Sequence, residues 1–400
     1  MSIVAEKHAS VFRSLKYFNA RLFFAGLLLS NIGSWLQLTA SSLLIYRLTG
    51  SAADLGYNVA FQFLPMLVMG TWCGALADRH NRRRIALISQ AALAVQALLL
   101  GTLDLSGVIN VPMVYALSLI LGIIGAFDNP ARRGLVTELV PQVDLPNAMS
   151  LNTAVMTGSR IFGAAIATAL VGPLGTGWLF ILNGVSYAAM IYGLTGLRKT
   201  EMYPAIMRPA GGSPVREVFK YVAGNRRLLT MFLVYVAVST FSFNFGVALP
   251  KLADLSWGDD RAFGWVMSVI GIGNLTGALL TARLKMVSLR WFVGNIALLG
   301  LASIGMAFSS NVWLAFLWSI PLGVGGAAMI ASGNAISQQE SPPDMRGRLL
   351  ALTAVAFLGS TPIGGPITGL IADSISPEWS LAYGGVVALV CAAVAAIAWR

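Results

Sequence analysis

Residues 74–84 read GALADRHNRRR and lie between two apolar runs, at 55–77 and 85–103. Asp78 stands where the first run ends, so it can accept backbone N–H groups of a helix or form an ion pair. Arg79, Arg82 and Arg83 follow it and would hold a short loop at the lipid headgroups. Orientation in a membrane needs only such arginines. Gly74 and Asp78 therefore indicate a further role, with Gly74 allowing a close helix contact.

The composition extends this interpretation to the whole chain. Of the 400 residues, 56% are hydrophobic and 11% are charged, whereas soluble domains have about 45–50% and about 25%. The 42 glycines are typical of closely packed membrane helices. The formal charge of +11 is divided among short clusters between apolar runs, which argues against nucleic acid as a partner. Cys73 and Cys391 lie in apolar runs, so neither a disulfide framework nor a metal site is expected, and no cofactor motif is present.

Apolar runs of roughly 20 residues predict membrane-spanning helices. The sequence therefore predicts an all-α integral membrane protein with twelve transmembrane helices in two parallel six-helix halves, residues 1–197 and 228–400. Residues 198–227 form the expected cytoplasmic linker, with a short amphipathic helix at 215–222. The spans are expected at 22–45, 55–77, 85–103, 111–128, 150–172, 177–197, 228–249, 262–283, 290–308, 312–332, 349–372 and 380–399.

The distribution of lysine and arginine predicts the orientation. With the N-terminus inside, 23 of the 27 basic residues fall in cytoplasmic segments. Arg47, Lys251 and Arg261 fall in external loops, and Arg160 lies within a span. The positive-inside rule therefore places both termini of this multi-pass protein in the cytoplasm.

The two halves repeat one another weakly. An offset of 201 residues pairs Gly122 with Gly323 and Gly163 with Gly364. Each such match is weak by itself, but the shared offset supports two equivalent halves.

The motifs resemble those of the major facilitator superfamily. Residues 74–84 are similar to its signature between helices 2 and 3, with Asn81 in place of the second glycine, and asparagine tolerates a left-handed turn. The stretches 128–133 (DNPARR), 138–141 (ELVP) and 145–148 (LPNA) resemble the loop after helix 4 in the branch of the enterobactin exporter and the transmembrane secretion effectors. Macrolide efflux pumps are similar. The resemblance covers nearly the whole chain and implies efflux by alternating access across a bacterial cytoplasmic membrane.

Helices 5 and 11 carry small residues where kinks are expected. Gly158 and Gly163 occupy the place of the antiporter signature, although its proline is absent. The equivalent stretch of helix 11 is richer in both glycine and proline. These positions favour either kinking during transport or static close packing. The helix 11 set is Gly359, Pro362, Gly364 and Pro366.

Arg160 is the outlier, because a charge near the bilayer centre requires a polar cavity or a partner. It is either a contact for an anionic substrate or a structural arginine bonded to neighbouring helices. The uncharged polar candidates either line a cavity or form interhelical hydrogen bonds. They are Asn31, Trp35, Gln37, Asn244 and Asn274.

No acid is expected in the middle of a span, which leaves proton coupling without an obvious carrier. Asp128 and Asp78, both expected at span ends, are the best candidates, although each could simply pair with Arg79, Arg82 or Arg132.

The leading hypothesis is a proton-linked exporter of a small amphipathic molecule, siderophore-like or drug-like, that works as a monomer among membrane lipids. The alternatives are an uptake permease of the same fold and, more remotely, a membrane-embedded enzyme. An enzyme would need a dense set of catalytic side chains, and the chain has two histidines.

Overall fold

The computed structural model describes residues 12–204, 214–258, 262–284, 286–342 and 361–399, with 345, 349, 352–353 and 356–357. Over these residues the regular elements are helices, and short 3-10 turns occur at Arg13–Lys16 (η1), Gln142–Asp144 (η2) and Lys199–Glu201 (η3). The α-helices are α1 (Phe18–Thr49), α2 (Ala52–Arg79), α3 (Arg82–Leu105), α4 (Val111–Val136), α5 (Leu145–Thr195), α6 (Pro214–Gly224), α7 (Arg226–Ser242), α8 (Phe245–Trp257), α9 (Ala262–Ala282), α10 (Leu289–Ala307), α11 (Val312–Gln339), α13 (Thr361–Ser374) and α14 (Pro377–Ala398).

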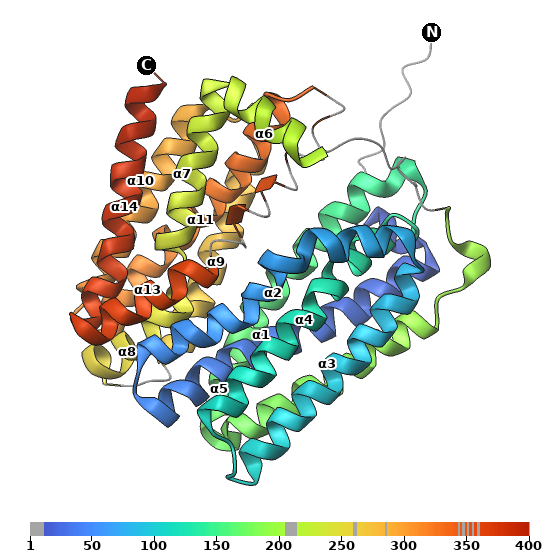
Figure 1. The fold of residues 1–400 in the computed structure, drawn as a ribbon, viewed down its shortest axis with the longest axis horizontal. Coiled ribbons are helices and arrows are strands. Elements are labelled where there is room, and N and C mark those ends of the chain that lie inside the picture. The colour runs from blue at the N-terminus through green and yellow to red at the C-terminus, as the bar shows by residue number, and fades with distance from the viewer. Residues whose placement is uncertain are drawn as a thin grey trace.

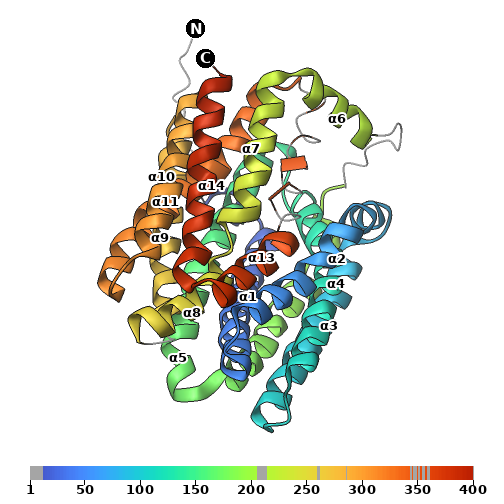
Figure 2. The same ribbon diagram turned by 60° about the vertical axis from the view of Figure 1, so that its left-hand side comes forward.

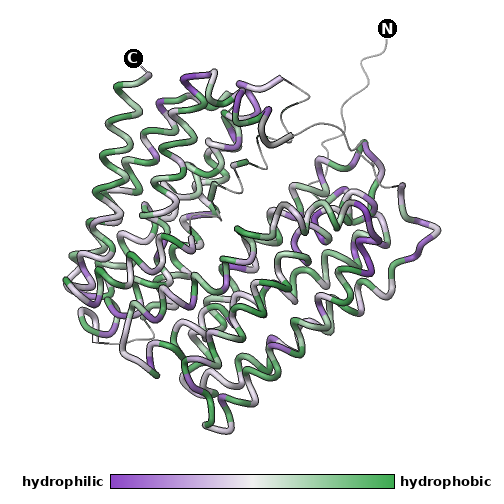
Figure 3. The backbone as a smooth tube through the Cα atoms, in the orientation of Figure 1, coloured by the Kyte–Doolittle hydropathy of each residue, from purple (hydrophilic) through white to green (hydrophobic). Residues whose placement is uncertain are grey.

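The expected twelve crossings are confirmed. Within the described ranges, nine helical stretches are long and apolar enough to span a membrane, with α7 and α8 counted as one. The stretch Gln142–Thr195 crosses twice, because the chain reverses at Gly175 (φ 78°, ψ 171°), a conformation that glycine adopts readily. Together with α2 and α13, these stretches make twelve crossings. Figure 3 shows apolar residues along the helices and polar residues gathered at their ends.

The outer surface is strongly apolar, as a bilayer requires. Large side chains such as those of Ile88, Val95, Tyr192, Trp313 and Ile397 are each more than 60% exposed. Scattered over several helices, they would be an aggregation hazard in water but are suited to lipid.

Short polar side chains start many of the helices. Ser51 accepts a hydrogen bond from the backbone N–H of Asp54, and Asn81 does the same for Arg84. Such caps satisfy backbone donors that a helix leaves unpaired in its first turn. Asn110, Asn225, Ser288, Asn311 and Ser376 cap α4, α7, α10, α11 and α14 in the same way.

The bundle has two distinct ends. We use "basic end" for the end at which α2 finishes and α3 begins, near Arg79 and Arg82, and "closed end" for the opposite one, where α1 finishes and α2 begins, near Thr49 and Ala52. At the closed end Thr176 donates to Asp104 at 2.6 Å. Figure 1 shows the C-terminus and α6 at the basic end.

The sequence repeat corresponds to equivalent packing in the two halves. Gly122 brings α4 against the carbonyl of Gln62 on α2, and its counterpart Gly323 brings α11 against the carbonyl of Ile270 on α9. In each case an added Cβ would collide with that carbonyl. Small residues thus produce the same helix pair in both halves.

The halves share a core near the closed end and separate toward the basic end. Ile45 and Leu55 belong to the same buried cluster as Phe245 and Leu249. Near the basic end the first half has a separate buried cluster, which includes Phe23 of α1, Leu135 of α4 and Met190 of α5 and, over the described residues, contains no residue of the second half. Figures 1 and 2 show the two groups of helices meeting at the closed end and diverging from it.

The helices do not keep the bounds of the expected spans, and two of the differences bear on the site. The seventh is broken at Phe243 and Asn244 into α7 and α8, and it extends to Trp257. The fourth does not finish at Asp128: α4 continues to Val136, so Asp128 lies eight residues inside the helix. Asp128 therefore lies inside a helix that continues past the expected end of the span, because hydropathy falls at DNPARR while the helix continues through it.

The expected amphipathic helix of the linker is α6. Val218 and Val222 are buried, whereas Phe219 and Lys220 are exposed. Tyr221 ties α6 to the second half by donating to the carbonyl of Glu340 at 2.8 Å. An open groove of about 930 Å³ lies here between α6 and the start of α7, away from every residue that the sequence nominated.

Candidate substrate and coupling site between the two halves

Arg160 lies at the interface of the halves, in the middle of the first arm of α5. Its guanidinium carbon is 5.2 Å from the centre of the Trp35 ring on α1, a cation–π distance. Across the interface it faces Asn274 on α9, about midway along that helix. Three residues nominated by the sequence therefore come together at one point.

The neighbours of Asn274 determine how its amide is oriented. Its nitrogen donates to the carbonyl of Gly323 at 3.0 Å, and its oxygen then accepts from Nη2 of Arg160 at 3.3 Å. The opposite orientation would place the amide nitrogen against a donor and its oxygen against an acceptor. The contact therefore joins the halves through one neutral acceptor.

Two close contacts between α5 and α9 lie on the closed-end side of this pair. Nearer the closed end, Thr168 packs against Gly264 and Ile161 against Gly271. Within the described part of the chain, the polar contacts between halves lie at the closed end, apart from that of Arg160 with Asn274. Among the described residues, Arg160 thus makes the polar contact between the halves that lies farthest from the closed end.

Asp128 is the centre of a buried polar network inside the first half. It is 1% exposed, and its Oδ2 lies 2.6 Å from Nε of Arg132, an ion pair and not an aligned hydrogen bond. Gln90 on α3 donates to its other oxygen at 3.0 Å. Asn31 accepts from Arg132 at 3.4 Å. The expected pairing of Asp128 with Arg132 is present, and Asn31 acts as an interhelical hydrogen-bonder.

Gln37 belongs to a second buried network of the first half. Its side-chain oxygen accepts from Asn183 at 2.6 Å, and its nitrogen donates to Gln96 at 3.2 Å. These amides join α1, α3 and the second arm of α5. For Gln37 the structure thus matches the alternative of an interhelical hydrogen bond.

Asn244 stands at the break between α7 and α8. Its amide donates to the carbonyl of Thr240 at 2.7 Å, which satisfies an acceptor freed where the helix ends. Gly364 of α13 approaches the same carbonyl so closely that a Cβ would collide with it. Asn244 therefore supports a discontinuous helix, a feature of many transporter sites.

The expected kink residues differ in their surroundings. Gly163 packs directly on the carbonyl of Ile32 and on Trp35, whereas a Cβ at Gly158 would meet nothing within 4 Å. Pro362 is buried at the start of α13, and Pro366 lies inside that helix. Gly359 lies outside the described residues.

The loop between α2 and α3 is bound to the first half. Arg82 forms an ion pair with Glu138 at 3.1 Å, and Arg83 donates to the carbonyl of Thr195 at 2.7 Å. Arg79 is exposed. The close contact expected at Gly74 is absent from this structure, where a Cβ would meet nothing within 4 Å. The side chain of Asp78 lies outside the described residues.

Two acids that hold distant segments together were not singled out by the sequence. Asp144 anchors the segment before α1 through Arg13, Lys16 and Tyr17. Asp373 contacts the start of α2 from the other half. Both partner sets are distant in sequence, so no local pattern could have identified these acids.

Twelve helices in two equivalent halves, joined at one end and with a central arginine between them, define a transporter of the major facilitator superfamily. The solved structures agree: a bacterial homologue of the human lysosomal transporter Spinster, in an inward-facing and occupied conformation, has a TM-score of 0.73 at 14% identity, covering 97% of both chains. The nucleoside transporter NupG, in a mutant form, has a TM-score of 0.76 at 14% identity, covering 96% of this chain and 100% of its own.

Within that superfamily, the chain belongs to the transmembrane secretion effector family, whose sequence profile matches residues 9–400. It is 26% identical to the uncharacterized transporter YfiS of Bacillus subtilis, covering 88% of this chain and 85% of the relative. It is 21% identical to the staphyloferrin A transporter of Staphylococcus aureus (88% and 89% covered) and 23% identical to macrolide efflux protein A of Streptococcus pyogenes (94% and 96%).

Proposed function

We propose that this transporter exports a small amphipathic molecule with an acidic group, in exchange for protons. The observation that carries the proposal is the position of Arg160 at the interface of the halves. Among the described residues no carboxylate pairs with it, and its neighbours are the neutral Trp35 and Asn274. A guanidinium in that position is available to an anion, which would supply the missing charge.

The chemistry around Arg160 favours a planar acidic substrate. A guanidinium presents parallel N–H donors that match a carboxylate or a deprotonated catechol. Trp35 adds an aromatic face beside it for the apolar part of the molecule. Asn274, whose amide oxygen lies 3.3 Å from Nη2 of Arg160, would be displaced when the anion binds. A siderophore-like or drug-like acid has this combination.

Asp128 and Arg132 are the proposed proton-coupling pair. A buried carboxylate next to an arginine can release that arginine when it takes up a proton, because the ion pair is then lost. Arg132 also touches Asn31 on α1, the helix that carries Trp35. Protonation of Asp128 would therefore change the contact between Arg132 and α1, the helix that lines the proposed site.

The basic end is proposed to face the cytoplasm, since loops rich in arginine stay on that side. We propose that this conformation, closed at the other end, is the one in which a substrate reaches Arg160 from the cytoplasm. The relative named for macrolide efflux supports export as the direction of transport. Residue-specific labelling checks it: in a background with both native cysteines replaced, Lys199→Cys should resist an impermeant thiol reagent added outside, and Ser310→Cys should react.

Transport in everted membrane vesicles tests the function. We expect a proton gradient, acidic inside, to drive accumulation of a planar carboxylic acid more than of its primary amide, and a protonophore to abolish it. Accumulation only in right-side-out vesicles would instead assign the uptake permease. Equal transport of acid and amide would contradict the proposed substrate class.

A further inference from the structure

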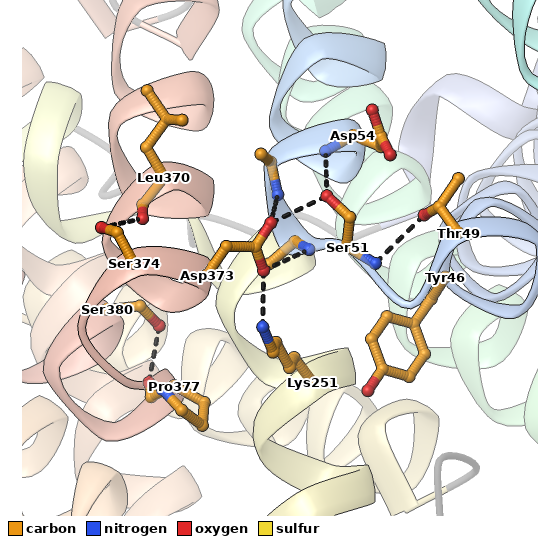
Figure 4. A network of polar contacts seen from close by, with 12 residues as sticks. Tyr46, Thr49, Ser51, Asp54, Lys251, Leu370, Asp373, Ser374, Pro377 and Ser380 are labelled. Carbon is orange, nitrogen blue, oxygen red and sulfur yellow. Dashed lines mark hydrogen bonds and ion pairs between the residues drawn. The ribbon is translucent and has the colours of Figure 1, made fainter.

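At the closed end, Asp373 of α13 reaches across to the opposite half. Its carboxylate accepts from the backbone N–H groups of Ala52 and Ala53, at 2.9 and 2.8 Å, and from the hydroxyl of Ser51 at 2.7 Å. Figure 4 shows these bonds converging on the acid, with Lys251 on its other side. The contact joins the last turn of α13 to the first turn of α2.

These bonds complete the N-terminus of α2. The first N–H groups of a helix have no partner within the helix, and they carry its positive dipole end. Ser51 satisfies the N–H of Asp54 at 3.1 Å, and Asp373 satisfies those of Ala52 and Ala53. The other half of the transporter thus supplies a second, charged cap to α2. Since Ser51 already caps this helix, α2 does not need the second cap in order to fold.

The backbones beside this cap are in direct contact. A Cβ at Gly369 would collide with the carbonyl of Ala52, and one at Gly56 would collide with the carbonyl of Gly365. Because backbone touches backbone here, even a small separation of the halves breaks this contact. Asp373 lies at the edge of this contact, where two of its bonds to α2 and Ser51 are exposed to water.

The strength of the cap suits a reversible gate. Charge-assisted hydrogen bonds are stronger than neutral ones, but these are partly exposed, so water can replace them. Lys251 is bound to Asp373 at 2.6 Å within the same half, so it keeps a counter-charge near the acid in either state.

We propose that Asp373 is a conformational latch: its cap on α2 stabilises the state that is closed at this end and must be released in each transport cycle. Asp373 acts on the balance between two states and need not touch the substrate. This assignment rests on the contacts at the closed end and is independent of the proposed substrate and of proton coupling.

Distance measurements between spin labels test the latch. In a background with Cys73 and Cys391 replaced by serine, labels at Val108 and Ser310 report on the closed end, and labels at His80 and Met286 on the basic end. We expect Asp373→Asn to raise the ratio of open to closed populations at the closed end about tenfold, with shorter distances at the basic end. Gly369→Ala, which wedges the same contact without changing charge, should shift both pairs in the same direction.

Two variants serve as controls. Asp104 is an acid at the same end that accepts from Thr176 within its own half, so Asp104→Asn should leave the distances unchanged. Lys251→Met removes the ion pair but keeps the bonds to α2, so its shift should be clearly smaller than that of Asp373→Asn. Wild-type distances in Asp373→Asn, or equal shifts in Asp373→Asn and Lys251→Met, would overturn the latch.

Discussion

Arg160 of α5 and Asn274 of α9 meet across the two halves, with Nη2 of the arginine 3.3 Å from the amide oxygen. The bond pairs a full charge with a neutral acceptor that also donates to the carbonyl of Gly323. An anionic ligand would be the stronger acceptor, because both partners would then be charged. Under the proposed function, an acidic substrate would replace this contact.

The first prediction follows from that replacement. Arg160→Ala should reduce transport of a planar acid at least about tenfold, the value of a lost charge-assisted contact, while its amide is affected less. Arg160→Lys keeps the charge but loses the fork of donors, so it should retain part of the activity. The measurement is transport per inserted molecule.

The matched control is Arg198→Ala, which removes an arginine 4.0 Å from the Phe18 ring at the basic end, outside the proposed site. It should leave the ratio of acid to amide transport unchanged. If Arg160→Ala lowers both substrates equally, Arg160 has a structural role only.

The second prediction concerns coupling. Asp128→Asn keeps the shape of the side chain but can no longer change charge. We expect it to abolish proton-driven accumulation while substrate exchange between the two sides of a vesicle continues. The measurements are gradient-driven uptake and counterflow in proteoliposomes. Glu201→Gln, which removes an exposed acid paired with Arg198, should leave both intact. Retained gradient-driven uptake in Asp128→Asn would exclude Asp128 as the carrier.

The third prediction uses two glycines of the same helix. Gly163→Ala should lower stability by about 1–3 kcal/mol, the usual cost of overpacking, because its Cβ meets the carbonyl of Ile32 and the Cβ of Trp35 at 2.6 Å. Gly158→Ala, whose Cβ would meet nothing within 4 Å, should be neutral or slightly stabilising. Thermal unfolding in detergent compares the two variants, and similar effects would contradict the close α1–α5 contact.

The fourth prediction is a pH dependence at the basic end. Hydrogen bonds from Lys16, Tyr17 and Arg13 lower the pKa of Asp144 to about 2 from the ordinary 3.8. A lowered pKa in the folded state stabilises the protein above the unfolded value and is lost as pH falls through the folded one. Asp144→Asn should therefore lower the melting temperature by a constant amount between pH 5 and 8. The difference from wild type should shrink below pH 4, and a constant difference down to pH 3 would refute this role.

The apolar runs by themselves determined the class and the number of crossings, since each span needs only its own backbone hydrogen bonds and an apolar surface toward lipid. The shared offset of Gly122 with Gly323 likewise predicted the equivalent halves, because close packing at these positions demands the smallest residue. Arg160 stood out in the sequence because a central charge is rare in a membrane.

Only the tertiary structure decided what these residues touch. The capping of α2 by Asp373 joins positions more than 300 apart in the chain, and no local pattern encodes such a contact. The continuation of α4 past Asp128 was also missed, because hydropathy records only where a segment becomes polar. Contacts with side chains of α3 and α4 are what keep the polar Asp128 buried within the helical bundle. The local sequence thus specifies which helices cross the membrane. The packing of one half on the other selects the few polar side chains that join them.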